Sequence, residues 1–171
     1  AILDIDFRND SIYALSSTRL YRGYLNNIAL SDSAQWVIDS RIPYDLNEPY
    51  AEIEMVDNQL YLLYKVAGYG ADSVFRVDNS SWQLVNQESF SLEINSIQAI
   101  GNQMAVSTDG GFMLYNADAQ WQTAYSSNLL DRWLNTSRVC YIKNAFWGAD
   151  KAWGLQEHIN EYACKRYPIE G

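Results

Sequence analysis

The residues that most often carry chemistry are scarce in this chain. Its 171 residues include one histidine, His158, and two cysteines, Cys140 and Cys164. A Ser-His-Asp triad would have to use His158, which stands beside a turn predicted at Asn160-Glu161. A tetrahedral zinc site needs four ligands, and one histidine with two separated cysteines does not supply them. We therefore expect no catalytic residue, no metal site and no cofactor.

Carboxylates are the remaining candidates for catalysis, because a pair of them can hydrolyse a glycosidic bond. Glu52 and Glu54 are two residues apart on a predicted strand, so they share one face of it. The interpretation that we favour is solvated charge at strand edges and in turns. The carboxylates considered are Asp45, Glu48, Glu52, Glu54, Asp109 and Asp150.

Two other polar segments lack the pattern of a ligand site. The Gly-rich stretch 67–72 has neither the lysine nor the following helix of a phosphate-binding loop. Asp118 and the pair Asp78-Asn79 are not part of a twelve-residue EF-hand loop. Because short acidic and amide side chains favour turns, we interpret these residues as turn formers.

The charge of the chain excludes one class of partner. The net charge is −9 at pH 7, and no cluster of Lys or Arg offsets it. Such a surface repels phosphate backbones, so we expect no nucleic-acid partner. No run of about 18 apolar residues occurs, so we expect no membrane insertion by this segment. The chain begins at Ala1 without Met, and we expect a mature or excised portion of a longer protein.

A unit that recurs about every 40–48 residues must position these side chains. Each copy has a short apolar strand, a turn, a second strand, an Asn/Asp-rich turn and an aromatic residue. The aromatic residues Trp36, Trp82, Trp121 and Tyr162 are 46, 39 and 41 residues apart. A period of this length with about four strands per unit is the signature of a β-propeller.

Alternating apolar residues and turn dipeptides predict four strands in each unit. Gly101-Asn102 and Asp109-Gly110 are expected to supply the positive φ that tight hairpins require. No stretch of 11 residues or more has helical periodicity. The predicted strands are 2–7, 11–16, 19–24 and 35–39; 50–56, 59–66, 73–77 and 82–85; 94–100, 103–107, 112–115 and 121–125; 139–143, 145–149, 154–159 and 162–167.

We therefore predict an all-β fold, namely a β-propeller or propeller segment of about four four-stranded antiparallel blades. The domain would be 1–171, with approximate blades 1–42, 43–90, 91–136 and 137–171. Blades pack face to face, so we expect interblade core positions for Trp36, Trp82, Trp121 and Trp147. His158 would lie toward the rim of the fourth blade, away from the axial channel where active sites of propellers usually lie.

Two segments resemble a known repeat. Residues 104–115 read MAVSTDGGFMLY, and residues 146–155 read FWGADKAWGL. Both are similar to the two-component-regulator propeller repeat, which typically has an aromatic residue, Thr-x-x-Gly-Gly-Leu and an Asp/Asn turn. Residues 167–171 look like the Tyr-x-Pro-x-Gly ending of such blades. The resemblance covers roughly the last 70 residues and is weak over the first two units.

The resemblance implies where such a chain acts. These repeats occur in periplasmic sensor regions of hybrid histidine kinases and in the propeller-bearing surface component of the type IX secretion system of Bacteroidetes. It implies a non-catalytic module that binds a protein or glycan in the periplasm or at the surface of a Gram-negative bacterium. A two-component sensor is the first interpretation, and a type IX component that binds partner proteins or lipopolysaccharide is the alternative. A propeller lyase or glycosidase is an alternative of another class.

Loop geometry indicates where a ligand would bind. In a propeller, the loops from second to third strand and from fourth strand to the next blade share one face. Here these loops carry aromatic and charged residues, which suit a polar or protein partner. Arg41 and Tyr44 belong to them. The predicted ligand- or partner-binding residues are Tyr69, Asp109, Arg132, Trp133, Asp150, Lys151 and Trp153.

The two cysteines are predicted not to form a disulfide. Cys140 falls in the first strand of the fourth unit and Cys164 in the fourth strand. These strands would be about 14 Å apart, whereas a disulfide needs Cα atoms within about 7 Å. We expect both thiols to behave as small buried hydrophobes.

Overall fold

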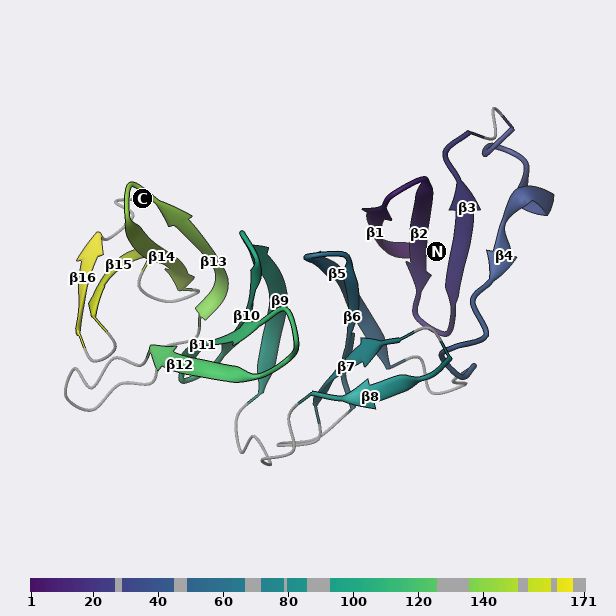
Figure 1. Cartoon of the computed structure of the whole chain (residues 1–171). Coiled ribbons are helices and arrows are strands. Elements are labelled where there is room, and N and C mark those ends of the chain that lie inside the picture. Colours follow the sequence, from purple (N-terminus) through teal and green to yellow (C-terminus); the bar gives the residue numbers. More distant parts are fainter. Residues whose placement is uncertain are drawn as a thin grey trace. The chain divides into compact units, whose positions relative to one another are not determined.

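Strands and tight turns make up the described part of the chain (Figure 1). The structure, a computed structural model, describes residues 1–26, 29–44, 49–66, 72–78, 80–85, 93–125, 136–150, 154–160 and 163–167. Within these residues no helix is long and apolar enough to cross a bilayer. The elements are β1 (Ile2–Arg8), β2 (Ser11–Ser16), β3 (Leu20–Tyr24), the 3₁₀ turn η1 (Ser33–Gln35), β4 (Val37–Ile38), β5 (Tyr50–Val56), β6 (Gln59–Tyr64), β7 (Ser73–Val77), β8 (Trp82–Leu84), β9 (Ile94–Ile100), β10 (Gln103–Thr108), β11 (Gly111–Asn116), β12 (Trp121–Tyr125), β13 (Thr136–Ile142), β14 (Ala145–Asp150), β15 (Gly154–Asn160) and β16 (Ala163–Tyr167).

These strands form four sheets of four antiparallel strands each (Figure 1). Consecutive strands are neighbours in every sheet, so each sheet is an up-and-down meander and contains one repeat unit. The predicted fold class, an all-β propeller segment of four blades, is confirmed. The largest difference from the predicted strand ends is in β13, which begins at Thr136 instead of Val139.

The first strand of every blade has the same irregularity. The register with the second strand shifts between Ile2 and Asp4, between Tyr50 and Glu52, and between Thr136 and Arg138. In the third blade the shift separates Ile94 from Ser96. A β-bulge bends its strand at a defined place, and the shared shift aligns the four blades residue by residue.

Tight turns join the first and second strands. Asp57 and Asn58 have φ of 47° and 63°, Lys143 and Asn144 have φ of 51° and 62°, and Gly101 has φ of 64°. The left-handed conformation in all three turns suits short hairpins, and Gly101 agrees with the prediction. The prediction of positive φ at Asp109-Gly110 is wrong. In that turn Gly111 has the positive φ, 129°, while the Thr108 hydroxyl accepts a hydrogen bond from the Gly110 N–H at 3.1 Å.

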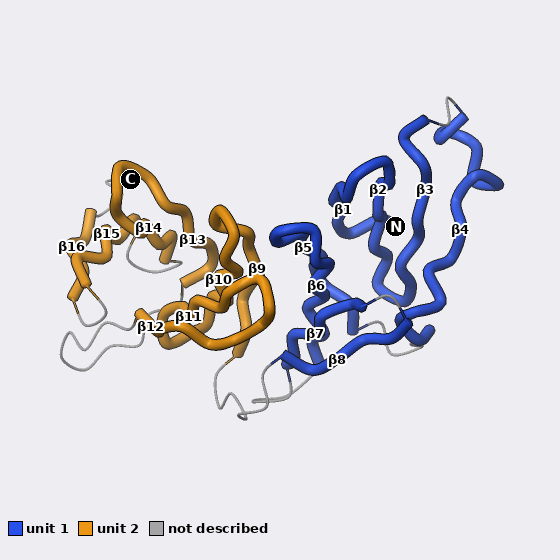
Figure 2. Tube along the Cα trace, in the orientation of Figure 1, with its two compact units in different colours: residues 1–89 blue, residues 90–171 orange. Residues whose placement is uncertain are grey.

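The chain divides into two compact units, residues 1–89 and 90–171, each of which holds two blades (Figure 2). In unit 1 the apolar core lies between the two sheets. Leu15 and Leu20 of the first blade pack in one cluster with Ile53 and Leu62 of the second. Trp82 packs against the same cluster, with its ring stacked on Phe75 at a centroid distance of 4.1 Å.

In unit 2 the core is smaller and includes the histidine. Ala105, Phe112 and Leu114 of the third blade cluster with Val139 of the fourth. His158 is buried in β15, with its ring edge-on to Phe112 at a centroid distance of 4.9 Å. The expected place of His158 toward the blade rim is therefore corrected, because its ring packs on the neighbouring blade.

Hydrogen bonds join the first strands of neighbouring blades within each unit. The Asp4 carboxylate accepts from the Ile53 N–H at 3.0 Å, and the Asp6 carboxylate accepts from the Met55 N–H at 2.5 Å. In unit 2 the Ser96 hydroxyl donates to the Ser137 carbonyl at 2.7 Å, and the Gln98 side-chain oxygen accepts from the Val139 N–H at 2.6 Å. Ser96 and Gln98 occupy the positions of Asp4 and Asp6 relative to the register shift.

Of the four predicted core tryptophans, Trp36, Trp82 and Trp147 are half-buried and one is exposed. Trp121, at the start of β12, is 60% exposed. It lies on the fourth strand of its blade and outside the core cluster between β10, β11 and β13. The prediction for Trp121 is wrong because an aromatic residue after a turn indicates a strand without indicating which face is covered.

The cysteines lie on the strands predicted for them. Cys140 is on β13 and Cys164 on β16, the first and fourth strands of the fourth sheet, and both are free thiols. The expectation that both are buried is wrong. Cys140 is exposed and Cys164 is half-buried.

Candidate ligand-binding site

Unit 1 has a hollow of about 360 Å³ beside the turn between β2 and β3. The Ser16 hydroxyl shapes this turn, because it accepts a hydrogen bond from the Arg19 N–H at 3.0 Å. The segment that follows β4 forms the other wall. The hollow is lined by Arg19, Leu20, Ile38, Asp39, Ser40, Ile42, Pro43 and Tyr44.

A cation and an aromatic ring meet at this hollow. The Arg19 guanidinium lies 4.3 Å from the centroid of the Tyr44 ring, within cation–π distance. Tyr44 is among the loop residues that the sequence placed on the ligand face, and its ring is half-exposed. The arrangement offers a positive charge and an aromatic surface beside an apolar floor of Leu20 and Ile42.

Arg41, from the same predicted face, has a structural role instead. Its guanidinium donates to the Asp39 carboxylate at 2.8 Å and to the Asp78 carbonyl at 3.2 Å. Burial by itself raises the pKa of Asp39, but the hydrogen bonds from Arg41 outweigh it and hold that pKa below its ordinary value. The pair is ionised, and Arg41 connects the end of the first blade to the turn after β7.

Of the seven predicted binding residues, two lie in the described part of the chain. Asp109 is in the turn between β10 and β11, where its N–H donates to the Glu93 carbonyl at 3.2 Å. Asp150 is buried at the end of β14, opposite Thr136 in β13. The other five, Tyr69, Arg132, Trp133, Lys151 and Trp153, lie outside the described residues.

Asp109 and Asp150 belong to the same end of two neighbouring sheets. Asp109 follows Thr108, which pairs with Ile94 at the start of β9. Asn95 follows Ile94 in β9, and its side chain donates to the carbonyl of Thr136, the first residue of β13, at 3.0 Å. Burial raises the pKa of Asp109 above its ordinary value. Within the described residues no group of three or more metal-ligating side chains is present.

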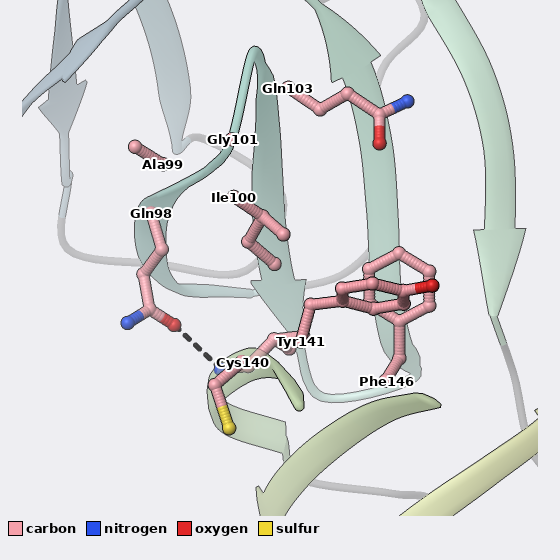
Figure 3. A pocket seen from close by; sticks show the side chains of 9 residues that line it. Gln98, Ala99, Ile100, Gly101, Gln103, Cys140, Tyr141 and Phe146 are labelled. Atoms are coloured by element: carbon pink, nitrogen blue, oxygen red, sulfur yellow. Dashed lines mark hydrogen bonds between the residues drawn. The ribbon is translucent and has the colours of Figure 1, made fainter. Parts of the chain in front are cut away.

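A larger groove, of about 720 Å³, lies on unit 2 between the third and fourth blades (Figure 3). The hairpin turn at Gly101 and the strand β13 form its walls. The Gln98 side chain holds these walls together through its hydrogen bond to the Val139 N–H (Figure 3). The lining residues are Gln98, Ala99, Ile100, Gly101, Gln103, Val139, Cys140, Tyr141 and Phe146.

The lining of this groove is uncharged and partly aromatic. Tyr141 is 51% exposed, and its ring lies 4.8 Å from that of Phe146. Amide side chains come from Gln98 and Gln103. Exposed rings stack on apolar faces of a ligand, and amides exchange hydrogen bonds with its polar groups. The groove therefore suits a neutral polar ligand.

The sequence did not indicate this groove. It is built at the turns between first and second strands, whereas the predicted ligand face used the other loops. Tyr141 and Phe146 lie in strands, and the strand pattern of the sequence does not indicate whether their side chains are exposed. The one sequence signal near the groove is the glycine at position 101, which predicts a tight turn. In the structure this turn borders open space, since a Cβ added at Gly101 would meet no other atom within 4 Å.

Comparison with known proteins supports the fold. No family model matches the chain, and no curated protein matches it in sequence. The chain is similar to the extracellular domain of a putative hybrid two-component system from B. thetaiotaomicron, with a TM-score of 0.71 and 15% identity over 99% of this chain. It is also similar to PorZ, a surface component of the type-IX secretion system of Porphyromonas gingivalis, with a TM-score of 0.66 and 13% identity over 99% of this chain.

A third similar structure is a calcium-binding regucalcin from Agrobacterium tumefaciens, with a TM-score of 0.61 and 15% identity over 98% of this chain and 59% of that one. The chain spans about a fifth of the first two structures, 22% and 21% of their lengths. At these identities the likeness is one of fold. The likeness in fold confirms the predicted resemblance to the propeller repeats of sensor and type IX secretion proteins.

Proposed function

We propose that this chain is a non-catalytic binding module of the bacterial envelope, and that its groove on unit 2 holds a glycan or a peptide. The observation that carries this proposal is the uncharged lining, which has an exposed tyrosine, Tyr141, and the amide side chains of Gln98 and Gln103. Glycans and extended peptides present both apolar faces and hydrogen-bonding groups. The fold of an extracellular domain from a putative hybrid two-component system supports a place in the sensor region of such a system.

A second function has its own support. The likeness to PorZ favours a surface component of the type IX secretion system, with a partner protein or lipopolysaccharide as ligand. The full-length gene separates the two functions. A transmembrane helix followed by a kinase indicates a sensor, whereas a C-terminal β-sandwich sorting domain indicates secretion.

The non-catalytic part of the proposal rests on the carboxylates and the histidine. Asp150 is buried beside Thr136, and the His158 ring packs on Phe112. Neither is presented to the groove. Hydrolysis of a glycan or ester that disappears in Asp109→Asn or Asp150→Asn would show that the chain is an enzyme.

The groove is tested with a panel of neutral oligosaccharides and unlabelled peptides, with binding followed by intrinsic tryptophan and tyrosine fluorescence. We expect at least one compound to bind, and Tyr141→Ala to weaken it about tenfold, which is the loss of about 1.4 kcal/mol expected for one stacked ring. Tyr24→Ala is the matched control, because Tyr24 is equally exposed on unit 1. Equal loss in both variants, or binding unaffected by Tyr141→Ala, would exclude the groove.

A further inference from the structure

In unit 1, two side chains of the first blade satisfy the outward backbone of the second. The Asp4 carboxylate accepts from the Ile53 N–H, and the Asp6 carboxylate accepts from the Met55 N–H. Ile53 and Met55 are two residues apart on β5, so their N–H groups leave the strand on the same side, away from β6. Both of these N–H groups therefore have an acceptor.

Unit 2 has one contact of this kind fewer. Relative to the register shift, Gln98 stands where Asp6 does, and Tyr141 stands where Met55 does. The Gln98 side chain nevertheless accepts from the N–H of Val139, two residues before Tyr141 (Figure 3). The Tyr141 N–H is thus left without the acceptor that the Met55 N–H has.

Tyr141 presents two backbone groups at the edge of its sheet. β13 is the first strand of that sheet and pairs with β14 on one side. The N–H and C=O of alternate residues in an antiparallel strand point away from the paired strand. Because the Val139 N–H points away from β14 toward Gln98, the N–H and C=O of Tyr141 point to the same side. Within the described part of the chain neither group has a hydrogen-bond partner.

These two groups lie where the groove is open. Tyr141 and Phe146 line it, and their rings are 4.8 Å apart. Every lining residue belongs to unit 2, so the groove is defined by that unit alone. Side chains of directly paired residues lie on the same face of a sheet. A residue that pairs with Tyr141 therefore places its side chain beside the Tyr141 ring.

We propose that the groove holds an extended peptide, one residue of which exchanges two hydrogen bonds with the backbone of Tyr141. This inference rests on the proposed ligand groove and chooses between the two ligand classes named for it. One residue of an extended peptide carries an N–H and a C=O on the same side, as an antiparallel strand requires, whereas a neutral glycan has no backbone pair of this kind. The mode is addition of a strand to a sheet edge. It is limited to one residue pair, because Gln98 occupies the N–H of Val139.

Backbone methylation of the ligand tests the pairing on the wild-type chain. The probes are uncharged pentapeptides with acetylated and amidated ends, and neutral oligosaccharides, titrated by intrinsic fluorescence. In the peptide that binds most tightly, we expect N-methylation of one residue to weaken binding about tenfold, because it removes the N–H that donates to the Tyr141 carbonyl. Methylation of the residue on either side should change the affinity less than about twofold, since those N–H groups point away.

A pair of variants tests the same contact from the protein side. Tyr141→Ala removes the ring and keeps the N–H, whereas Tyr141→Pro removes both. Proline is tolerated at an edge position whose N–H faces solvent. We expect Tyr141→Pro to bind the peptide about tenfold more weakly than Tyr141→Ala does. Phe7→Pro is the matched control, because Phe7 occupies the equivalent position of the first blade and should bind as wild type does. Circular dichroism checks the fold of each variant, and the methylation scan decides if Tyr141→Pro does not fold.

The other outcomes separate this inference from the proposed function. If oligosaccharides bind with a loss in Tyr141→Ala and no peptide binds, the groove is a ligand site and the peptide inference is wrong. If a peptide binds but tolerates methylation at every position, or if Tyr141→Pro folds and binds as tightly as Tyr141→Ala, the pairing with Tyr141 is wrong. If neither class of probe binds, both the groove and the peptide are excluded.

Discussion

His158 shows how packing changes the chemistry of a residue. Its ring contacts Phe112 and Tyr125, and neither ring nitrogen has a hydrogen-bond partner within the described structure. Burial lowers its pKa from 6.5 to about 4, because the charged imidazolium would lose its hydration. The sequence placed this histidine beside a turn, and no local pattern distinguishes a turn residue from one that packs on the next blade.

The stability of unit 2 should therefore depend on pH through His158. A folded pKa below the unfolded one means that protons bind more tightly to the unfolded chain. The contribution of His158 to the free energy of unfolding is therefore fully present above pH 6.5. It is lost as the pH drops toward 4, and the loss is about 3 kcal/mol at most. Urea unfolding at pH 7 and pH 4.5 measures this loss.

His158→Phe separates this effect from the titration of carboxylates. Phenylalanine keeps an aromatic ring against Phe112 and does not ionise. We expect its loss of stability between pH 7 and pH 4.5 to be smaller than that of wild type by about 2–3 kcal/mol. Equal losses in the two proteins would mean that His158 is hydrated in the folded state.

At the scale of the elements, the hydrogen bonds between first strands are the main connection that the sequence did not indicate. Asp4 and Asp6 alternate with apolar residues and look like solvated charge. In the structure their carboxylates accept from the backbone of β5. Glu52 and Glu54, the carboxylate pair considered for glycosidase chemistry, occupy the same positions relative to the register shift in the second blade.

Removal of one of these acceptors should destabilise unit 1. Asp6→Ala leaves the Met55 N–H without its acceptor, and we expect a loss of about 1–3 kcal/mol in the free energy of unfolding. Asp6→Asn retains a side-chain oxygen and should lose less. Asp10→Ala is the control, because Asp10 is exposed in the same blade and its side chain has no hydrogen bond within the described structure. An equal loss in Asp10→Ala would assign the effect to net charge.

At the scale of the whole molecule, charge remains the property that decides the class of partner. The net charge of −9 predicts that the chain does not bind double-stranded DNA even at low salt, where phosphate contacts are strongest. Fluorescence anisotropy of a labelled duplex measures this directly, and saturable binding that weakens with added salt would contradict the prediction. The hollow with Arg19 is compatible with this expectation, since a single arginine does not form a basic surface.

Local sequence patterns were enough to predict the fold class, the four blades and nearly all strand positions. These depend on alternation and on turn residues such as Asp57-Asn58, which act over a few neighbours in the chain. Which side chains are buried became clear only from the three-dimensional arrangement of the blades. The burial of His158, the exposure of Trp121 and the groove at Tyr141 each depend on a blade that lies some 40 residues away in sequence. Strand patterns distinguish the two faces of a sheet, but they contain no information on which neighbour covers each face.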